Sequence, residues 1–288
     1  MTELLLQLRL PRGLESGAAS PGRRRLLSRS FLAAAFVTLL INADLATAQS
    51  SAEKGRQIAN AALDADRGFE SLTADMVMIL RNKAGQENRR NLRIKSLEVA
   101  SDGDKLLFVF DSPRDVKGTA LLIHGHRTKP DDQWLYLPAL KRVKRISSSN
   151  RSGSFLGSEY AYEDLSKAGL EKFTYSHVRN EACGSLTCTV TEYVPADKGS
   201  GYVRMLYWHD TGEHRNHRIE YYDRKNSHLK TLTHSGYEKH AGQFWRPTAS
   251  TMINHVTGKS TELQWNNYTF RAGLRDQEFS KTGLRRIR

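Results

Sequence analysis

The stretch KLLFVFDSPRDVKGTALLIHGHRTKPDDQWLYLP, residues 105–138, decides what kind of fold the chain can adopt. It contains three apolar runs, LLFVF, TALLI and WLYLP, separated by turn-forming residues. A strand with one face in water alternates apolar and polar residues, and these three runs do not. Both of their faces must therefore be covered. The pattern leaves two explanations open: a well-filled barrel core, or a curled sheet whose inside is a lipid-sized cavity.

Short β-like segments continue on both sides of this stretch, from LTADMVMILRN, which begins at Leu72, to STELQWNNYTFRA, which begins at Ser260. Polar turn clusters such as PADKGSG, DTGEH and VTGKS recur at a spacing of roughly 10–15 residues, which is typical of an antiparallel meander. A run of about eleven strands favours a strongly curled sheet or a barrel. Before the strands, Ser51–Glu70 has an apolar stripe, which predicts an amphipathic helix lying on the sheet. We therefore expect a mainly β (α+β) fold.

The first 48 residues are typical of a cleavable export signal. Four arginines, Arg23, Arg24, Arg25 and Arg29, precede the apolar run FLAAAFVTLLI, and the small-residue triplet ATA follows it. The apolar run is too short to span a bilayer, which needs about 20 residues. The sequence thus predicts a signal peptide at 1–48 and a single exported domain at 49–288 in the periplasm. It leaves open whether export is by the Sec or the Tat route.

The chain is strongly basic, with 44 Lys and Arg against 31 Asp and Glu and a net charge of +13. Such a protein is attracted to anionic surfaces, including lipid headgroups, nucleic acid and acidic partners. The basic run KRVKR, residues 141–145, invites a nucleic-acid interpretation, but an exported protein meets little nucleic acid. Basic side chains on an edge strand also prevent edge-to-edge aggregation. We expect a membrane surface and no nucleic acid.

Two cysteines, Cys183 and Cys188, lie in the segment ACGSLTC. Export implies an oxidising compartment, in which close cysteines usually pair. This predicts a disulfide that pins a short turn between two strands. A redox-active pair is the alternative, but such pairs are typically Cys-x-x-Cys at a helix N-terminus, and the residues around Cys188 are strand-like.

The segment ISSSNRSGSFLGSEYAYEDL, residues 146–165, is rich in Ser, Gly and aromatic residues but carries no complete catalytic motif. Ser154 lies one position too early for a Gly-x-Ser-x-Gly elbow, and no Gly-Lys-Ser/Thr ends the Gly-rich run. The three carboxylates, Glu159, Glu163 and Asp164, are better explained as ion pairs or caps. The pair His124 and His126 lacks the further ligands of a metal shell. We expect a non-enzymatic protein without cofactor or metal.

Three stretches resemble a known family: DVKGTALL (115–122), DDQWLYLPALKRVKRISSSNRSGSFLGSEYAYEDL (131–165) and FWRPTASTMINHVTGKSTEL (244–263). They are similar to the exported outer membrane lipoprotein-sorting proteins of the LolA/LolB-like superfamily of periplasmic carriers. The resemblance implies a half-open, strongly curled antiparallel β-barrel with helical or loop segments plugging its concave side. It also implies that the concavity holds acyl chains, with an RND-type exporter as partner. The identity of the lipid or lipoprotein and the direction of transport stay open.

On this resemblance, residues 146–165 are expected to form a plug or lid at the barrel mouth. Its apolar side chains would point inward, Gly153 and Gly157 would allow tight turns, and nearby arginines would meet carboxylates or a lipid headgroup. The alternative is that the segment only closes the barrel core and binds nothing. The candidate ligand-binding residues are Leu121, Trp134, Tyr136, Leu137, Arg145, Arg151, Phe155, Leu156, Tyr160 and Tyr162.

The resemblance predicts a periplasmic carrier that holds the acyl chains of a lipid or lipoprotein in an apolar cavity. A structural adaptor that docks on an envelope exporter and binds no lipid is the alternative. An enzyme acting on envelope lipids is a third reading, and it lacks a credible catalytic set. The sequence does not show which strand faces point inward, because so many strands are apolar on both.

Overall fold

The computed structural model describes residues 50–167 and 169–287. Thirteen strands form one antiparallel sheet, which confirms the mainly β class with an N-terminal helix. The expected number of about eleven strands is wrong, because even short segments such as the four-residue β6 pair as strands. The strands are β1 (Ser71–Arg81), β2 (Glu87–Leu97), β3 (Lys105–Ser112), β4 (Ala120–His124), β5 (Asp132–Leu137), β6 (Arg142–Arg145), β7 (Phe173–Cys183), β8 (Leu186–Pro195), β9 (Tyr202–Asp210), β10 (Asn216–Asp223), β11 (His228–His240), β12 (Phe244–Asn254) and β13 (Ser260–Phe270).

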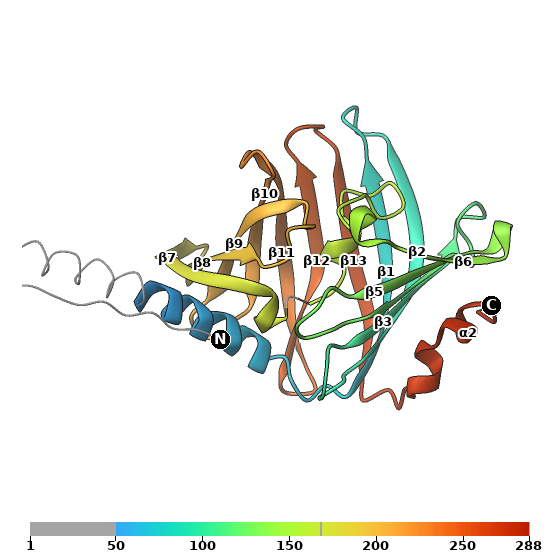
Figure 1. The fold of residues 1–288 in the computed structure, drawn as a ribbon, viewed down its shortest axis with the longest axis horizontal. Coiled ribbons are helices and arrows are strands. Elements are labelled where there is room, and N and C mark those ends of the chain that lie inside the picture. Colours follow the sequence, from blue (N-terminus) through green and yellow to red (C-terminus); the bar gives the residue numbers. More distant parts are fainter. Residues whose placement is uncertain (1–49, 168, 288) are drawn as a thin grey trace, which may run out of the picture. The chain divides into compact units, whose positions relative to one another are not determined.

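The sheet is a meander that is not closed. Its order is β6-β5-β4-β3-β2-β1-β13-β12-β11-β10-β9-β8-β7, so the first and last strands pair in the middle and β6 and β7 form the two edges. The pairing of β1 with β13 runs from Leu72 opposite Phe270 to Arg81 opposite Ser260. Figure 1 shows a curled sheet, with the described residues between β6 and β7, 146–167 and 169–172, lying between its two edges.

The inner face of the sheet carries the main core. In β3, Phe108 and Phe110 point to this core, whereas Leu107 and Val109 belong to a separate cluster on the outer face. The alternation follows from strand geometry, in which successive side chains point to opposite faces. Residues from β1, β2, β4, β9, β10 and β11 share the inner core, so it lines the concave side along most of the sheet.

The C-terminal segment covers the outer face of β3, β4 and β5. It contains the 3₁₀ turn η5 (Asp276–Phe279) and the short helix α2 (Lys281–Leu284), which lies beside these strands in Figure 1. Phe279 and Leu284 are 1% exposed, and they pack with residues of the three apolar runs: Leu107, Val109, Ala120, Leu122 and Trp134. His124 Nε2 lies 2.7 Å from the carbonyl oxygen of Phe279. The runs are therefore apolar on both faces because one face meets the interior and the other meets this cover.

The N-terminal helix spans residues 50–64, shorter than the predicted Ser51–Glu70. A turn follows it, and Gly68 adopts a left-handed φ of 88°. The helix lies against the edge strand β7, where Ser51 Oγ donates to the carbonyl of His177 at 2.7 Å. A Cβ on Gly55 would lie 2.8 Å from backbone atoms of Ser176 and His177, so glycine permits this close approach. The helix thereby shields part of an unpaired sheet edge.

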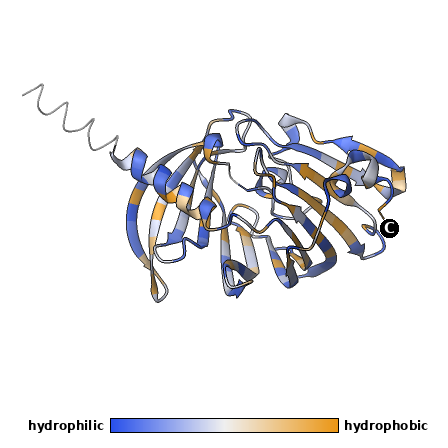
Figure 2. Ribbon diagram, turned by 90° about the horizontal axis from the view of Figure 1, so that it is seen from below, coloured by the Kyte–Doolittle hydropathy of each residue, from blue (hydrophilic) through white to orange (hydrophobic). Residues whose placement is uncertain are grey.

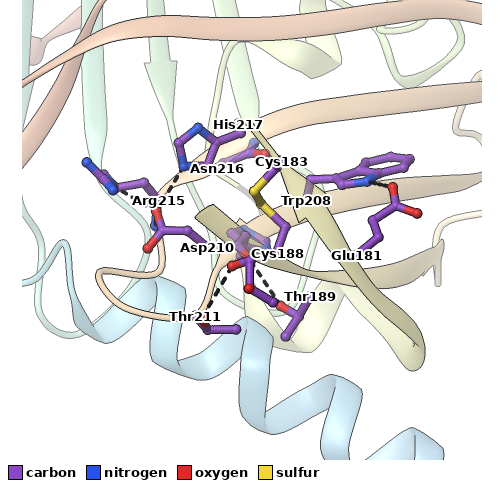
Figure 3. The surroundings of a disulfide bond; sticks show 12 residues. Glu181, Cys183, Cys188, Thr189, Trp208, Asp210, Thr211, Arg215, Asn216 and His217 are labelled. Atoms are coloured by element: carbon purple, nitrogen blue, oxygen red, sulfur yellow. Dashed lines mark hydrogen bonds and ion pairs between the residues drawn. A yellow bond between two sulfur atoms is a disulfide. The ribbon is translucent and has the colours of Figure 1, made fainter. Parts of the chain in front are cut away.

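A disulfide joins the two strands of the β7–β8 hairpin at that same edge. Cys183 and Cys188 are bonded, with their Cα atoms 5.8 Å apart, which confirms the predicted pairing. Cys188 is fully buried on the outer face with Leu206 and Trp208. Figure 3 shows the disulfide beside Trp208, whose Nε1 donates to Glu181. The bond, the indole and the carboxylate together fix the end of a hairpin that has no partner strand beyond β7.

Replacing Phe279 by Ala should lower the free energy of unfolding by roughly 3–5 kcal/mol, because a fully buried aromatic ring is lost from the cover over β3–β5. Urea denaturation followed by circular dichroism measures the change. The control is Leu140→Ala, which removes a side chain that is 63% exposed and should change stability by no more than about 0.5 kcal/mol. Equal effects of the two variants would contradict the assigned cover.

The double variant Cys183→Ser/Cys188→Ser should be about 2 kcal/mol less stable than the oxidised protein, since the loop that the bond closes is short. Amide exchange should rise most in the β7–β8 hairpin. Wild-type protein treated with reductant is the control and should show the same stability as the double variant. An unchanged urea midpoint in both would show that the hairpin does not need the bond.

Candidate functional site

The concave side of the sheet encloses a cavity of about 780 Å³. Its walls come from the inner faces of strands on both sides of the β1–β13 pair, from the N-terminal helix and from residues 146–172. Most of the lining is apolar or aromatic, including Met76, Ile94, Met205 and Leu232. Figure 2 shows how hydrophobic and hydrophilic positions alternate along many strands, which gives the sheet this apolar inside. The volume falls within the range of about 300–1,000 Å³ that small-molecule sites usually have.

Residues 146–172 bring an aromatic cluster to the inside of the sheet. Phe155 is fully buried, and its ring centroid lies 6.2 Å from that of Phe108, 5.8 Å from that of Phe110 and 5.6 Å from that of Tyr162. The chain can turn sharply after Phe155, since Leu156 and Gly157 have φ values of 50° and 83°. The segment therefore occupies the concave side as part of the core.

The middle of the segment, at Leu156 and Tyr162, is hydrogen-bonded to β2 and β5. The side-chain amide of Gln133 donates to the carbonyl of Tyr162 at 2.9 Å, and Gln133 is almost fully buried. Arg90 Nη1 donates to the carbonyl of Leu156 at 2.7 Å. Both contacts join backbone oxygens of the segment to side chains of the sheet.

The same part of the segment is held to β11 on the opposite side by a buried ion pair. Lys230 Nζ lies 2.6 Å from Asp164 Oδ2 and also donates to the carbonyl of Glu159 at 2.9 Å. The two charged side chains are only 4% and 1% exposed. Tyr202 donates its hydroxyl to the second oxygen of Asp164 at 2.8 Å. The geometry pairs both charges fully, which a buried pair requires if it is not to cost stability.

The remaining carboxylates of the segment serve similar structural contacts. Glu163 accepts from Ser200 Oγ at 2.8 Å and from the backbone N–H of Gly201 at 2.9 Å, while burial raises its pKa above the usual value. Glu159 accepts from the amide of Asn254 at 2.7 Å. The expected role of Glu159, Glu163 and Asp164 in ion pairs and caps fits these contacts, although their partners are not the nearby arginines.

The predicted candidate residues fall in different places. Arg151, Phe155 and Tyr160 line the cavity, and Arg151 also pairs with Asp197. Leu121, Leu137, Leu156 and Tyr162 belong to or pack against the inner core. Trp134 and Tyr136 lie in the outer cluster with the C-terminal cover, and Arg145 is exposed and pairs with Asp132. A ligand-binding role for any of them, and a plug or lid role for the segment, stay predictions.

The sequence interpretation missed the inner faces of β8, β9 and β10, which line the cavity with Tyr193, Tyr207, His209 and Tyr221. Tyr207 and His209 are two positions apart in YVRMLYWHD and so share a face. Strand alternation was therefore a usable signal. It was inconclusive because the positions between them, such as Leu206 and Trp208, are also apolar and buried.

A cluster of charges holds the end of the N-terminal helix over the cavity. Asp66 lies 2.5 Å from Lys167 Nζ and 2.6 Å from Arg246 Nη1, and Lys167 also reaches Asp104 at 3.1 Å. Burial alone would raise the pKa of Asp66, but the two cations outweigh burial and hold the pKa below its usual value. Lys167 Nζ also lies 4.5 Å from the centre of the Phe69 ring. The cluster ties the helix to the segment and to β12.

Two histidines face the cavity in their neutral form. Burial lowers the pKa of both His209 and His234 to about 4. His234 Nδ1 lies 2.8 Å from Ser250 Oγ, whereas His209, which is 4% exposed, makes no side-chain hydrogen bond to any residue in 50–167 or 169–287. No group of three or more His, Cys, Asp or Glu within those residues is arranged to hold a metal ion. Within the part of the chain that the structure describes, no helix is long and apolar enough to cross a membrane.

The pKa of His209 is about 6.5 in the unfolded chain and about 4 in the folded protein. Between these pH values the unfolded chain binds a proton at His209 and the folded protein does not. The free energy of unfolding should therefore fall as the pH falls from 6.5 to about 4. His209→Gln removes this contribution. The loss of unfolding free energy between pH 7 and pH 4.5 should be about 2 kcal/mol smaller than in the wild type. Urea denaturation at the two pH values measures it.

The control is His228→Gln, which changes an exposed histidine outside the cavity and should alter the pH dependence of stability less than His209→Gln does. If the free energy of unfolding falls by the same amount in His209→Gln and in the wild type between pH 7 and pH 4.5, the pKa of His209 is not lowered by burial.

The chain is similar to one family model and to several solved structures. A family model described only as that of an uncharacterized protein matches residues 102–286. No curated protein matches the chain. A crystal structure of an outer membrane lipoprotein-sorting protein domain from Vibrio parahaemolyticus is 48% identical, covers 81% of this chain and 99% of its own, and has a TM-score of 0.80.

Two further solved structures are similar over a comparable length. A DUF1329 family protein from Desulfovibrio piger is 29% identical, covers 81% of this chain and 99% of its own, and has a TM-score of 0.77. A LolA superfamily protein from Nitrosomonas europaea is 20% identical, covers 80% of this chain and 98% of its own, and has a TM-score of 0.65, which shows a shared fold.

Proposed function

The chain belongs to the outer membrane lipoprotein-sorting domain family, and on this premise we propose that it is a carrier of the cell envelope. It would hold the acyl chains of a lipid or lipoprotein in the concave cavity while they cross an aqueous space. The related Vibrio structure is named for lipoprotein sorting, which supports a lipid or lipoprotein carrier in general. The predicted export signal at residues 1–48 agrees with an envelope location and lies outside the described residues.

The observation that carries the proposal is an apolar cavity of about 780 Å³ inside a sheet that is not closed. Burying acyl chains supplies affinity without much polar specificity, at about 0.8 kcal/mol for each methylene group removed from water. Ten buried methylenes would contribute roughly 8 kcal/mol before the costs of ordering and association. An interior of this size and chemistry would hold such a chain.

The N-terminal helix offers a route for exchange. It presents small side chains to the cavity, Ala59 and Ala62, together with Leu63. Its end is held by the ion pairs of Asp66 with Lys167 and Arg246. Moving a helix with so little apolar surface costs less than breaking the core around Phe155. Release would need a partner that stabilises the displaced position, because a ligand or partner shifts an equilibrium only by its preference for one state.

The alternative, an adaptor that docks on an exporter and binds no lipid, has no need for a cavity of this size. A filled interior would favour the adaptor, and the cavity of about 780 Å³ argues against it. An RND-type exporter as partner stays a prediction from the family resemblance. The direct test is native mass spectrometry of the mature protein purified from the envelope without detergent. A co-purifying lipid or acylated peptide would support the carrier, and a clean mass with no uptake from added lipid vesicles would favour the adaptor.

Ala62→Trp should reduce uptake of a fluorescent fatty acid at least tenfold, because the indole would occupy cavity volume next to the helix. The matched control is Ala52→Trp on the same helix, where the side chain is exposed and does not line the cavity. This control should bind as the wild type does. Thermal unfolding of both variants checks that the fold is kept, and equal uptake by the two would argue against the cavity as the binding site.

A further inference from the structure

Eight tyrosines line the cavity, and their hydroxyl groups fall into two classes. Five hydroxyls donate to oxygens of the protein: Tyr160 to Ser250, Tyr175 to Leu170, Tyr202 to Asp164, Tyr237 to Asn216 and Tyr268 to Pro247. The hydroxyls of Tyr193, Tyr207 and Tyr221 bond to no residue in the part of the chain that the structure describes. These three tyrosines come from the adjacent strands β8, β9 and β10, and strand pairing therefore brings them close together.

The strand register places these three side chains and His209 on one patch of the inner face. Tyr193 lies opposite Met205, and Met205 lies opposite Tyr221, while Tyr207 is two residues further along β9. The rings of Tyr193 and Tyr207 stack with centroids 4.0 Å apart, and the His209 ring stacks on Tyr207 at 5.6 Å. We call Tyr193, Tyr207, His209 and Tyr221 the β8–β10 patch.

The polar groups of the patch face the cavity and have no hydrogen-bond partner among the described residues. Tyr193, His209 and Tyr221 are each 3–4% exposed, and Nδ1 of His209 has no hydrogen-bond partner among the described residues. Buried polar groups in folded proteins nearly always have a partner. A buried donor or acceptor without one, such as this ring nitrogen, costs about 1–3 kcal/mol. One buried ring nitrogen and three tyrosine hydroxyls without a protein partner, gathered on one wall of the cavity, indicate a partner that enters it.

The charges around the patch limit the chemistry of that partner. Burial raises the pKa of Tyr193 and Tyr221 well above the usual value and lowers the pKa of His209, so all are neutral near pH 7. The nearby cation Lys230, with its ammonium 5.1 Å from the Tyr221 ring, is already paired with Asp164. An anionic group here would be desolvated without a free counter-charge, which is costly. A neutral oxygen is accepted at much lower cost.

We propose that the β8–β10 patch recognises a neutral hydroxyl or carbonyl oxygen carried on an otherwise apolar ligand. The preferred cargo is then an oxygenated lipid, such as a hydroxylated or keto acyl chain, rather than a plain hydrocarbon chain. Tyrosine hydroxyls donate to such an oxygen and can also accept from it, and neutral His209 can do either through its free ring nitrogen. This inference rests on the proposed carrier function and adds the chemical class of the cargo.

The test compares stearic acid with its 3-hydroxy, 10-hydroxy, 12-hydroxy and 10-oxo derivatives, using the full mature protein and displacement of a fluorescent fatty acid. The wild type should bind at least one oxygenated chain about tenfold more tightly than stearic acid, the effect expected of one well-made buried hydrogen bond. In Tyr193→Phe/Tyr207→Phe/Tyr221→Phe the rings remain and the hydroxyls are lost. This variant should bind stearic acid at least as well as the wild type and lose the preference.

Tyr268→Phe is the matched control, since its hydroxyl also belongs to a cavity tyrosine but is already bonded to the carbonyl of Pro247. It should keep the wild-type preference. If the triple variant does not fold, Tyr207→Phe alone should weaken the preference without changing the affinity for stearic acid.

Equal affinities of the wild type for all five chains would overturn this inference, because the patch would then bind only water. The proposed carrier function would not be affected by that result. A preference that survives in the triple variant would overturn it as well. If none of the five chains binds to the wild type, the carrier function itself fails, and the inference fails with it.

Discussion

The ion pair between Lys230 and Asp164 is the contact on which the interior of this molecule depends. The sheet has two free edges, so the chain between them must cross the concave side, and this pair fixes that crossing to β11. Both charges are nearly inaccessible, and Asp164 is also held by Tyr202 and by the backbone N–H of Ala161. Breaking one partner of such a buried pair typically costs about 3–5 kcal/mol. A segment held this firmly shapes the cavity as a fixed wall.

The inner face of the sheet forms both a packed core and the wall of the cavity. Around Phe155 the aromatic rings of the segment and of β3 pack closely and leave little room, which gives the fold its core. The rest of this face lines the cavity, which reaches strands on both sides of the β1–β13 pair and mixes methionine and leucine with tyrosine, tryptophan and histidine. One sheet can do both because its inner face is long and the rings around Phe155 fill only part of it. The two explanations raised by the apolar runs, a filled core and a cavity, are thus both present.

Much of the fold was predictable from local sequence. The turn clusters and short apolar strands predict an antiparallel sheet, and the close cysteines in an exported chain predict the disulfide. The direction of the side chains in β3–β5 was not predictable, because the residues on both faces are apolar and only the distant C-terminal segment with Phe279 distinguishes them. Trp134 and Tyr136 therefore looked like cavity residues and lie under that cover. The patch around Tyr207 was missed for the same reason, since Trp208 beside it is equally apolar and points to the outer face.

The pairing of β1 with β13 has a consequence for how the domain is made. These two strands lie at the centre of the sheet, and they come from opposite ends of the folded chain. Contacts between residues so far apart in sequence form slowly, because a large loop must close before they contribute. The two lateral meanders, β2–β6 and β7–β12, are built from neighbouring strands and can form as the chain emerges. The pairing of β1 with β13 cannot form until the last strand is present. A chain interrupted before β13 would therefore expose the unpaired edge of β1 along its full length.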